Sequence, residues 1–270
     1  MKKRILITGS TDGIGLATAE MLLGQGHHVL LHGRDKAKLK QTEKKFSTLK
    51  VGGSIQSYSA DLSNMCEVKD LAKALVENNI KLDVLVNNAG VFKTPEPITK
   101  DGLDVRFAVN TIAPYLLTKQ LLPILNKNGR VINLSSAAQS TVDPKALVGQ
   151  KYLNDMEAYS QSKLAITTWS RSMALSLKDN GPIIIAVNPG SLLASKMVQE
   201  GFGVEGSDIS IGAEILMRAA LSDEFAEASS QYFDNDAGQF ASPHPDALNS
   251  KKSDTIVKTI EAILNELGVN

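Results

Sequence analysis

Tyr159 and Lys163 are the residues of this sequence whose types and spacing could most clearly do chemistry. They stand four positions apart in a helical pattern, so their side chains share one face of the expected helix. A phenol has an ordinary pKa of about 10, and a neighbouring cation favours its ionised form. Such a pair can therefore give and take a proton near neutral pH. Taken alone, the same spacing also describes an ordinary surface pair on a helix.

A glycine-rich segment near the N-terminus is the second candidate for chemistry. An apolar run at 4–8 leads into Gly9-Ser10-Thr11-Asp12-Gly13-Ile14-Gly15, and a helical pattern follows at once. A strand, a glycine turn and a helix in this order direct free backbone N–H groups toward a phosphate. The spacing differs from the older Gly-x-Gly-xx-Gly fingerprint, and a turn that needs glycine for its conformation alone is the alternative.

The residues after the second expected strand, 28–31, indicate which dinucleotide the chain would bind. An acidic side chain at this place holds the ribose 2′-hydroxyl of NAD. Gly33 offers no side chain there, and Arg34 offers a planar fork that suits a 2′-phosphate. We therefore expect NADP(H) to be preferred over NAD(H). A solvated loop arginine is the alternative for Arg34, and Asp12 in the glycine turn is a signal against the preference.

Four further strands are expected at 54–59, 83–86, 129–134 and 183–187, with helical patterns between them. This alternation predicts an α/β fold: a single-domain, Rossmann-type, doubly wound parallel sheet with helices on both faces, formed by residues 1–270. Side chains that follow the carboxyl ends of such strands line a ligand crevice. The segments in question are Ala60-Asp61-Leu62, Asn87-Asn88-Ala89-Gly90, Ser135-Ser136 and Asn188-Pro189-Gly190.

The chain beyond Gly190 is less regular. Residues 191–207 show no sustained period, and we expect a substrate lid at about 191–222 that includes a helix at 209–221. A short last strand at 231–233 is followed by a C-terminal extension at about 234–270, with a helix at 255–267. The segment 137–157 mixes polar and apolar residues and predicts a loop with a helical turn.

Composition narrows the possible partners and compartments. Lys+Arg and Asp+Glu both count 29, which gives no global field for nucleic acid or an anionic membrane. The single cysteine, Cys66, cannot form an internal disulfide and suits a reducing compartment. No segment approaches the roughly 18–20 apolar residues of a membrane helix. We expect a cytoplasmic protein with no nucleic-acid or membrane partner and no metal site.

Taken together, these motifs resemble the classical short-chain dehydrogenase/reductase family, and they follow in the family's order up to about Gly190. The resemblance implies a nicotinamide dinucleotide across the strand ends. It implies that the cofactor-binding residues are Gly9, Ser10, Gly13, Ile14, Gly15, Arg34, Asp61, Leu62, Asn88, Ala89, Gly90, Tyr159, Lys163, Pro189 and Gly190.

The resemblance also implies the catalytic roles. Tyr159 would protonate a carbonyl oxygen while hydride arrives from the nicotinamide, and Lys163 would hold the nicotinamide ribose and lower the pKa of Tyr159. Ser136 would hydrogen-bond the substrate oxygen, and Asn110 would help to hold a water that links Lys163 to solvent. Ser135 stands next to Ser136, so this choice of serine follows the family pattern.

Two departures from the family pattern concern the substrate and the cofactor carboxamide. The segment between Ser136 and Tyr159 is longer than in many classical members and resembles that of retinol-dehydrogenase-like and protochlorophyllide-reductase-like members, which leaves the substrate open. A threonine that usually touches the carboxamide is missing at its common spacing after Pro189-Gly190, and Ser195, one place later, is the candidate to replace it. The substrate is therefore expected only as a small carbonyl or alcohol compound.

The family also commonly pairs the helix of Asn110 and the helix of Tyr159 across a two-fold axis. The resemblance therefore implies a homodimer or homotetramer, with Trp169 and Met173 as apolar candidates for the interface. Packing of these two residues on the sheet is the alternative.

Two other functions compete with an oxidoreductase. A redox sensor that binds the dinucleotide without turnover would need no serine, tyrosine or lysine at the site, and all three are present. An epimerase or dehydratase of the family's extended branch also uses the tyrosine-lysine pair. The short C-terminal part and the Asn87-Asn88-Ala89-Gly90 motif are evidence against it.

Overall fold

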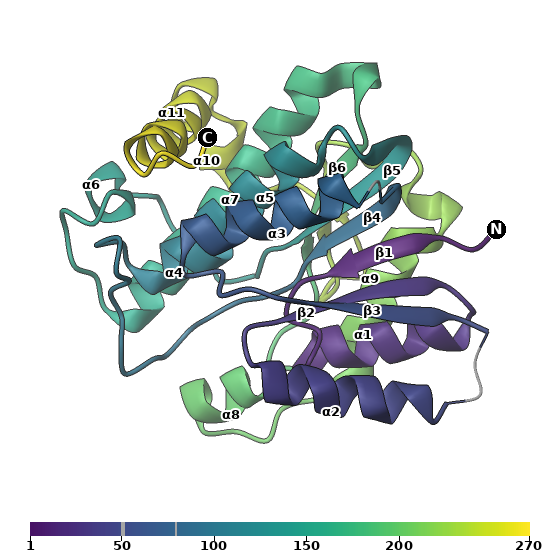
Figure 1. The fold of residues 1–270 in the computed structure, drawn as a ribbon. Helices are drawn as coiled ribbons and strands as arrows, with labels where there is room; N and C mark the ends of the chain where they lie inside the picture. The colour runs from purple at the N-terminus through teal and green to yellow at the C-terminus, as the bar shows by residue number, and fades with distance from the viewer. Residues whose placement is uncertain (50–51, 79) are drawn as a thin grey trace.

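The computed structural model describes residues 1–49, 52–78 and 80–270 and confirms the expected Rossmann-type fold (Figure 1). Eight strands form one sheet in the order β3-β2-β1-β4-β5-β6-β7-β8. All neighbours pair in parallel except β7 and β8, which are antiparallel. The strands are β1 (Arg4–Ile7), β2 (His28–Gly33), β3 (Ser54–Ser59), β4 (Leu82–Asn87), β5 (Leu125–Leu134), β6 (Ile183–Asn188), β7 (Tyr232–Asp234) and β8 (Gln239–Ala241).

Helices cover both faces of this sheet, which explains why its central strands are almost continuously apolar. Successive side chains point to opposite faces, so Leu6 contributes to one hydrophobic cluster while Ile5 and Ile7 contribute to the other. The helices that contribute to the cluster of Leu6 are α3 (Met65–Glu77), α5 (Ala113–Leu121), α7 (Asp155–Leu177) and α11 (Ser250–Glu266). The opposite face is covered by α1 (Gly13–Gly24), α2 (Lys36–Ser47) and α9 (Ser210–Leu221).

Polar side chains fix the helix starts that matter for the strand ends. Asp12 caps α1 by accepting from the Gly13 N–H, and Asp35 caps α2. Asn154 and Glu157 form a reciprocal capping box at the start of α7, the helix that carries Tyr159. The short helices are α4 (Val105–Phe107), the π-helical turn η1 (Ala108–Ile112), α6 (Pro144–Leu147), η2 (Lys178–Asn180), α8 (Lys196–Phe202), η3 (Asp223–Phe225) and α10 (Pro245–Leu248).

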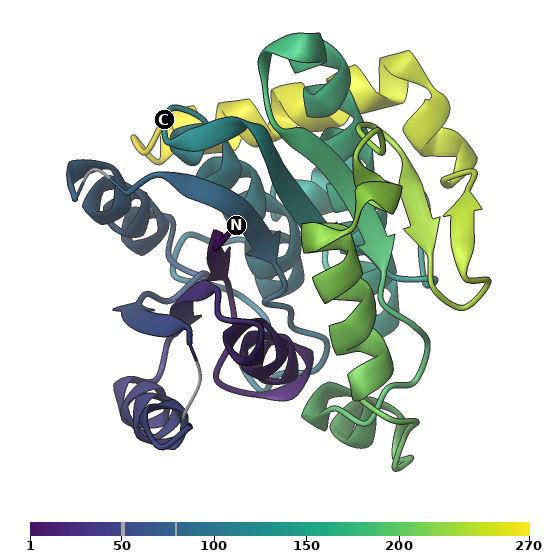
Figure 2. The ribbon, with the colours of Figure 1, turned by 90° about the vertical axis from the view of Figure 1, so that its right-hand side faces the viewer.

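The structure differs from the expected elements mainly toward the C-terminus. The single short strand is a hairpin of β7 and β8, visible at one edge of the sheet in Figure 2. The irregular segment 191–207 contains α8, and 137–157 contains α6, as its expected helical turn. Helix α9 packs in the core against α1, so we restrict the proposed lid to residues 191–209. No helix in the described parts of the chain has the length and apolar character to cross a membrane.

Helix α11 lies over α5 and α7, the two helices expected to pair between subunits. Trp169 is 0% exposed and packs edge-to-face on Tyr115, with a centroid distance of 5.4 Å. Tyr115 donates a hydrogen bond to Glu261 of α11, and Lys119 forms an ion pair with the same carboxylate at 2.7 Å. The interpretation of Trp169 as an interface residue is therefore wrong: it lies in the core of its own chain.

Candidate active site

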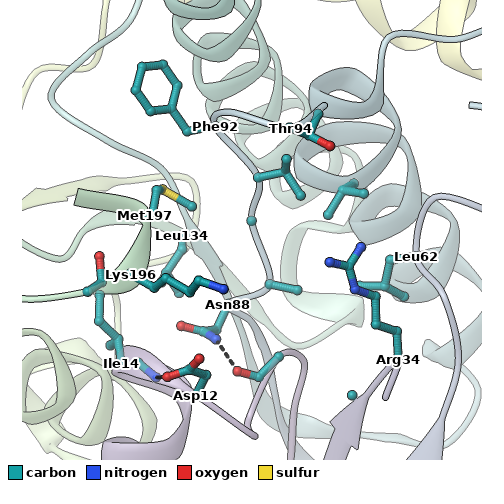
Figure 3. A pocket seen from close by; sticks show the side chains of 18 of the residues that line it. Asp12, Ile14, Arg34, Leu62, Asn88, Phe92, Thr94, Leu134, Lys196 and Met197 are labelled. Atoms are coloured by element: carbon teal, nitrogen blue, oxygen red, sulfur yellow. Dashed lines mark hydrogen bonds between the residues drawn. The ribbon is translucent and has the colours of Figure 1, made fainter. Parts of the chain in front are cut away.

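A cavity of about 600 Å³ runs along the carboxyl ends of the strands. In Figure 3, Arg34 and Leu62 lie on one side of this pocket and Lys196 and Met197 on the other, with Asn88 between them. The predicted site residues that line it are Gly9, Gly13, Ile14, Arg34, Asp61, Leu62, Asn88, Ala89, Gly90, Tyr159, Lys163 and Pro189.

The glycine turn has the conformation and close packing that require glycine. Gly9 and Gly13 have φ angles of 65° and 56°, in the left-handed region. A Cβ atom at Gly15 would lie 2.3 Å from the carbonyl oxygen of Gly9. Asn88 braces the turn, because its side-chain amide donates to the carbonyls of Thr8 and Gly9 at 2.8 and 3.1 Å.

His32 is a functional residue of this turn that the sequence did not indicate. Its Nδ1 accepts from the Gly9 N–H at 3.2 Å, and its Nε2 lies 3.1 Å from the Ala60 carbonyl oxygen. Burial lowers the pKa of His32 to about 4, so the ring is neutral near pH 7. Ser10 is fully buried, and its hydroxyl bonds the backbone of His32. The side chain of Ser10 therefore connects the glycine turn to the backbone of β2.

The end of the cavity near β2 carries two cations, Arg34 and Lys38, and two carboxylates, Asp12 and Asp61. Arg34 is exposed and lines the cavity together with Lys38, which lies 3.9 Å from Asp12. Gly33 contributes no side chain, and a Cβ there would lie 2.8 Å from Cγ2 of Thr11. Asp61 lines the same end and accepts hydrogen bonds from the backbone N–H and hydroxyl of Ser63.

Tyr159 lines the other end of the cavity, and Ser136 lies beside it. Burial raises the pKa of Tyr159, and the neighbouring Ser136 side chain opposes this effect in part. The Ser136 hydroxyl also accepts from the Ala138 N–H at 3.1 Å. Ser135 lines the cavity, but its hydroxyl has other partners: it lies 2.6 Å from the Thr167 hydroxyl and donates to the Lys163 carbonyl at 3.2 Å. The geometry therefore favours Ser136 as the serine that acts with Tyr159.

Lys163 is 4% exposed and lies beside the tyrosine ring, with Nζ 5.6 Å from the ring centroid. Its ammonium donates to the Leu134 carbonyl at 2.8 Å. Burial lowers the pKa of Lys163 to about 8. The expected lowering of the Tyr159 pKa is not the net effect in this structure, because burial of the phenol is the larger influence.

Asn110 lies on η1 and is 1% exposed. Its side chain accepts from the Val91 N–H at 2.8 Å and donates to the Val91 carbonyl and the Ser162 hydroxyl at 2.9 and 3.0 Å. Asn110 thus joins the segment after Gly90 to the helix of Tyr159. π-Helical turns of this kind often occur at functional sites.

Two further residues hold the tyrosine side of the site and were missed from sequence. Phe92 packs edge-to-face on Tyr159, with ring centroids 5.1 Å apart. The buried Arg106 pairs with Asp104 and with Asp155 on the first turn of α7, and it donates to the Phe92 carbonyl at 3.4 Å. An arginine in a helical run gives no signal of such a role, because its partners are distant in sequence.

A further side of the cavity is formed by Pro189, Ser195 and residues of α8. Gly190 has a φ of 122°, in the region that favours glycine. The Ser195 hydroxyl caps α8 by accepting from the Val198 N–H at 3.3 Å. Ser195 lines the cavity as expected of a replacement for the threonine, while its hydroxyl also serves the helix.

The residues present fit a nicotinamide dinucleotide. The cavity places the glycine turn, in which Gly9 and Gly15 are closely packed, beside the cations Arg34 and Lys38 at one end, and it has Tyr159 and Lys163 at the other. Backbone N–H groups and cations suit phosphate groups. No group of three or more side chains suited to a metal ion occurs in the described ranges.

This fold and site define a class: dinucleotide-binding α/β proteins with a serine, tyrosine and lysine at the strand ends. The chain belongs to the short chain dehydrogenase family, whose sequence model matches residues 3–203. It is an oxidoreductase of the kind that acts on CH–OH groups, like relatives named as dehydrogenases. The resemblance to retinol-dehydrogenase-like members is confirmed.

Three comparisons illustrate these relationships. Retinol dehydrogenase 13 from Homo sapiens is 31% identical over 254 residues, which cover 86% of this chain and 76% of that protein. An uncharacterized protein from Mycobacterium Paratuberculosis shares the fold at a TM-score of 0.80 and 23% identity, covering 97% of this chain and 93% of that one. The Pseudomonas aeruginosa RhlG/NADP complex has a TM-score of 0.70 at 25% identity and covers 87% and 95%.

Proposed function

We propose that this protein is an NADP(H)-dependent oxidoreductase that interconverts a carbonyl and an alcohol, with Tyr159 as general acid and base. The observation that carries the proposal is the pair of Tyr159 and Lys163 at one end of the cavity, with Ser136 beside the tyrosine. A redox sensor without turnover would have no need of this arrangement. An extended-branch epimerase is disfavoured by the similarity to relatives named as dehydrogenases.

The side chains divide the work of moving one proton. The dinucleotide, when bound, supplies or accepts the hydride. The Ser136 hydroxyl bonds the substrate oxygen, and Tyr159 delivers a proton to that oxygen in reduction and removes it in oxidation. The buried ammonium of Lys163 favours the phenolate that remains after proton delivery. Donors already in place at a developing oxyanion are costly to lose, at roughly 10²–10³ in rate for one donor.

The proposed preference for NADP(H) rests on the cations Arg34 and Lys38 at the end of the cavity near β2. Arg34 is exposed at the mouth, Lys38 lines the same end, and Gly33 offers no carboxylate to hold a 2′-hydroxyl. The Asp12 carboxylate near Lys38 opposes the preference in part. The complex of a similar protein with NADP is consistent with this proposal.

The substrate is proposed only as a small carbonyl or alcohol compound. The cytoplasmic localisation and the homodimer or homotetramer stay predictions. Since α11 covers α5 and α7, we propose that any pairing of copies uses a different surface from those two helices.

Replacing Tyr159 with Phe tests the proposed function. The change keeps the ring that packs on Phe92 and deletes the hydroxyl, so folding and NADPH binding should survive. Turnover should fall by about 10²–10⁴-fold, the usual worth of positioned acid–base catalysis. The substrate comes from a screen of aldehydes, ketones and quinones with NADPH, together with retinol because of the relative's name.

Tyr152→Phe is the matched control: it deletes the same group, a phenol hydroxyl, from a side chain that is 78% exposed. It should leave turnover unchanged. Undiminished turnover by Tyr159→Phe would show that another group supplies the proton.

A further inference from the structure

Residues 234–236, at the end of β7 and the start of the turn to β8, lie against the segment 188–191 that contains the Asn-Pro-Gly motif. The side-chain amide of Asn188 donates to a carboxylate oxygen of Asp234 at 2.9 Å and to one of Asp236 at 2.8 Å. Asn188 is 1% exposed, so its amide has little access to water. The motif asparagine is thus held by two carboxylates from a turn that is distant in sequence.

Asp236 also holds Ser191, the first residue after the motif. Its Oδ1 accepts from the Ser191 N–H at 2.8 Å, and its Oδ2 accepts from the Ser191 hydroxyl at 2.6 Å. Asn235 adds two bonds to this set of contacts, which we call the clamp: its side chain donates to the Pro189 carbonyl at 2.9 Å, and its N–H donates to the Asn188 carbonyl at 3.1 Å. Side chains of the turn therefore add a set of contacts to the backbone pairing of β6 with β7.

The clamped segment forms one wall of the cavity and the base of the lid. Pro189 lines the cavity, and Leu192 directly after Ser191 has a φ of 51°, unusual for a branched side chain. The Ser207 N–H donates to the Leu192 carbonyl at 2.8 Å, and this bond joins the two ends of the segment 192–207. Asp236 therefore acts on Ser191, the first residue of the proposed lid.

We propose that Asp236 is a positioning residue for the dinucleotide site: it fixes the segment 188–191, and with it the wall at Pro189 and the base of the lid. It acts through Ser191 and Asn188 and touches neither substrate nor cofactor. This inference rests on the proposed binding of NADP(H). The proposal assigns a role to the acidic residues at 234–236, which lie outside the family motifs.

Asp236→Asn tests the role of the carboxylate with almost no change in shape. Asp236 Oδ2 accepts from two donors and Oδ1 from a third, so an amide NH2 in either orientation faces a donor and loses acceptors. Because Asp236 is exposed, the effect is moderate: we expect the Kd and KM for NADPH to rise about three- to tenfold. Glu227→Gln, an exposed acid ahead of β7, is the matched control for loss of one charge.

Two readouts are measured on the full-length chain. NADPH fluorescence titration gives the Kd, and hydrogen exchange reports the Ser191 amide, which should exchange faster in Asp236→Asn and at the normal rate in Glu227→Gln. Asp236→Ala is the second variant and should show both changes at least as strongly. The melting temperature, measured alongside, establishes that the variants are folded.

Each outcome separates the two proposals. Absence of NADPH binding by the unmodified protein would contradict the proposed function itself. If the unmodified protein binds NADPH and the variants bind it equally well, with faster exchange at Ser191, the turn is only scaffold and the positioning role is overturned. Unchanged exchange at Ser191 would overturn it as well.

Discussion

Gly15→Ala gives the sharpest test of the glycine turn as a phosphate site. The added Cβ would lie 2.3 Å from the Gly9 carbonyl oxygen and 2.4 Å from the Asn88 amide nitrogen. Contacts below 3.0 Å are not tolerated, so the turn must move. Rotation of one side chain cannot relieve this contact, because Gly9 is itself held by His32 through its N–H and by Asn88 through its carbonyl.

The size of the effect follows from these contacts. Inserting a methyl group into a close-packed place costs about 1–3 kcal/mol, and a displaced hydrogen bond adds about 1 kcal/mol. The free energy of unfolding should fall by this amount. The Kd for NADPH should rise at least about tenfold, because the backbone N–H groups that would face the phosphate move with the turn.

Gly24→Ala at the other end of α1 is the matched control. A Cβ there meets no atom within 4 Å, so stability should be unchanged or should rise by about 0.4–1 kcal/mol. Urea unfolding and NADPH fluorescence titration measure both quantities for both variants. NADPH affinity of Gly15→Ala within twofold of the unmodified protein would refute the role of the turn.

Two remaining predictions concern the ends of the cavity. Arg34→Ala should weaken NADPH binding by about tenfold or more and leave the Kd for NADH unchanged. Lys36→Ala, outside the cavity lining, should change neither Kd. Equal losses of affinity for both cofactors in Arg34→Ala would contradict the 2′-phosphate contact. Burial lowers the pKa of Lys163 from 10.5 to about 8, so Lys163 loses its proton at a lower pH in the folded chain than in the unfolded chain. Below pH 8 the buried ammonium therefore destabilises the fold by the full amount, and this cost shrinks as the pH rises toward 10.5. Urea unfolding of Lys163→Met should therefore show greater stability than the unmodified chain at pH 7 and a smaller advantage at pH 10, and a constant difference across this range would contradict the buried charge.

The strand-end motifs could be predicted from sequence because parallel strands end at one edge of the sheet. Gly9, Asp61, Asn88 and Pro189 come from four different βα connections, and one cavity contains them all. The choice of Ser136 over Ser135 followed the family pattern. The structure adds that the Ser135 hydroxyl contacts the Thr167 hydroxyl, which leaves Ser136 as the serine whose side chain acts on the tyrosine.

The residues that hold the site in place could not be predicted, because their partners lie far away in the chain. His32 supports Gly9, Arg106 connects Phe92 with Asp155, and Asp236 clamps Ser191. Each is a common residue type in a stretch with no spacing signal. Such roles depend on long-range geometry, which a local pattern does not contain.

The C-terminal helix α11 covers part of the surface that the family resemblance assigned to the pairing of subunits. The pattern of α5 and α7 is apolar enough for a subunit interface, and this chain supplies its own cover. Ile256, Ile260 and Leu264 of α11 enter the same hydrophobic cluster as Trp169. A second copy would have to displace this helix together with the ion pair of Lys119 and Glu261. The apolar faces of α5 and α7 are therefore covered by α11, a helix of the same chain.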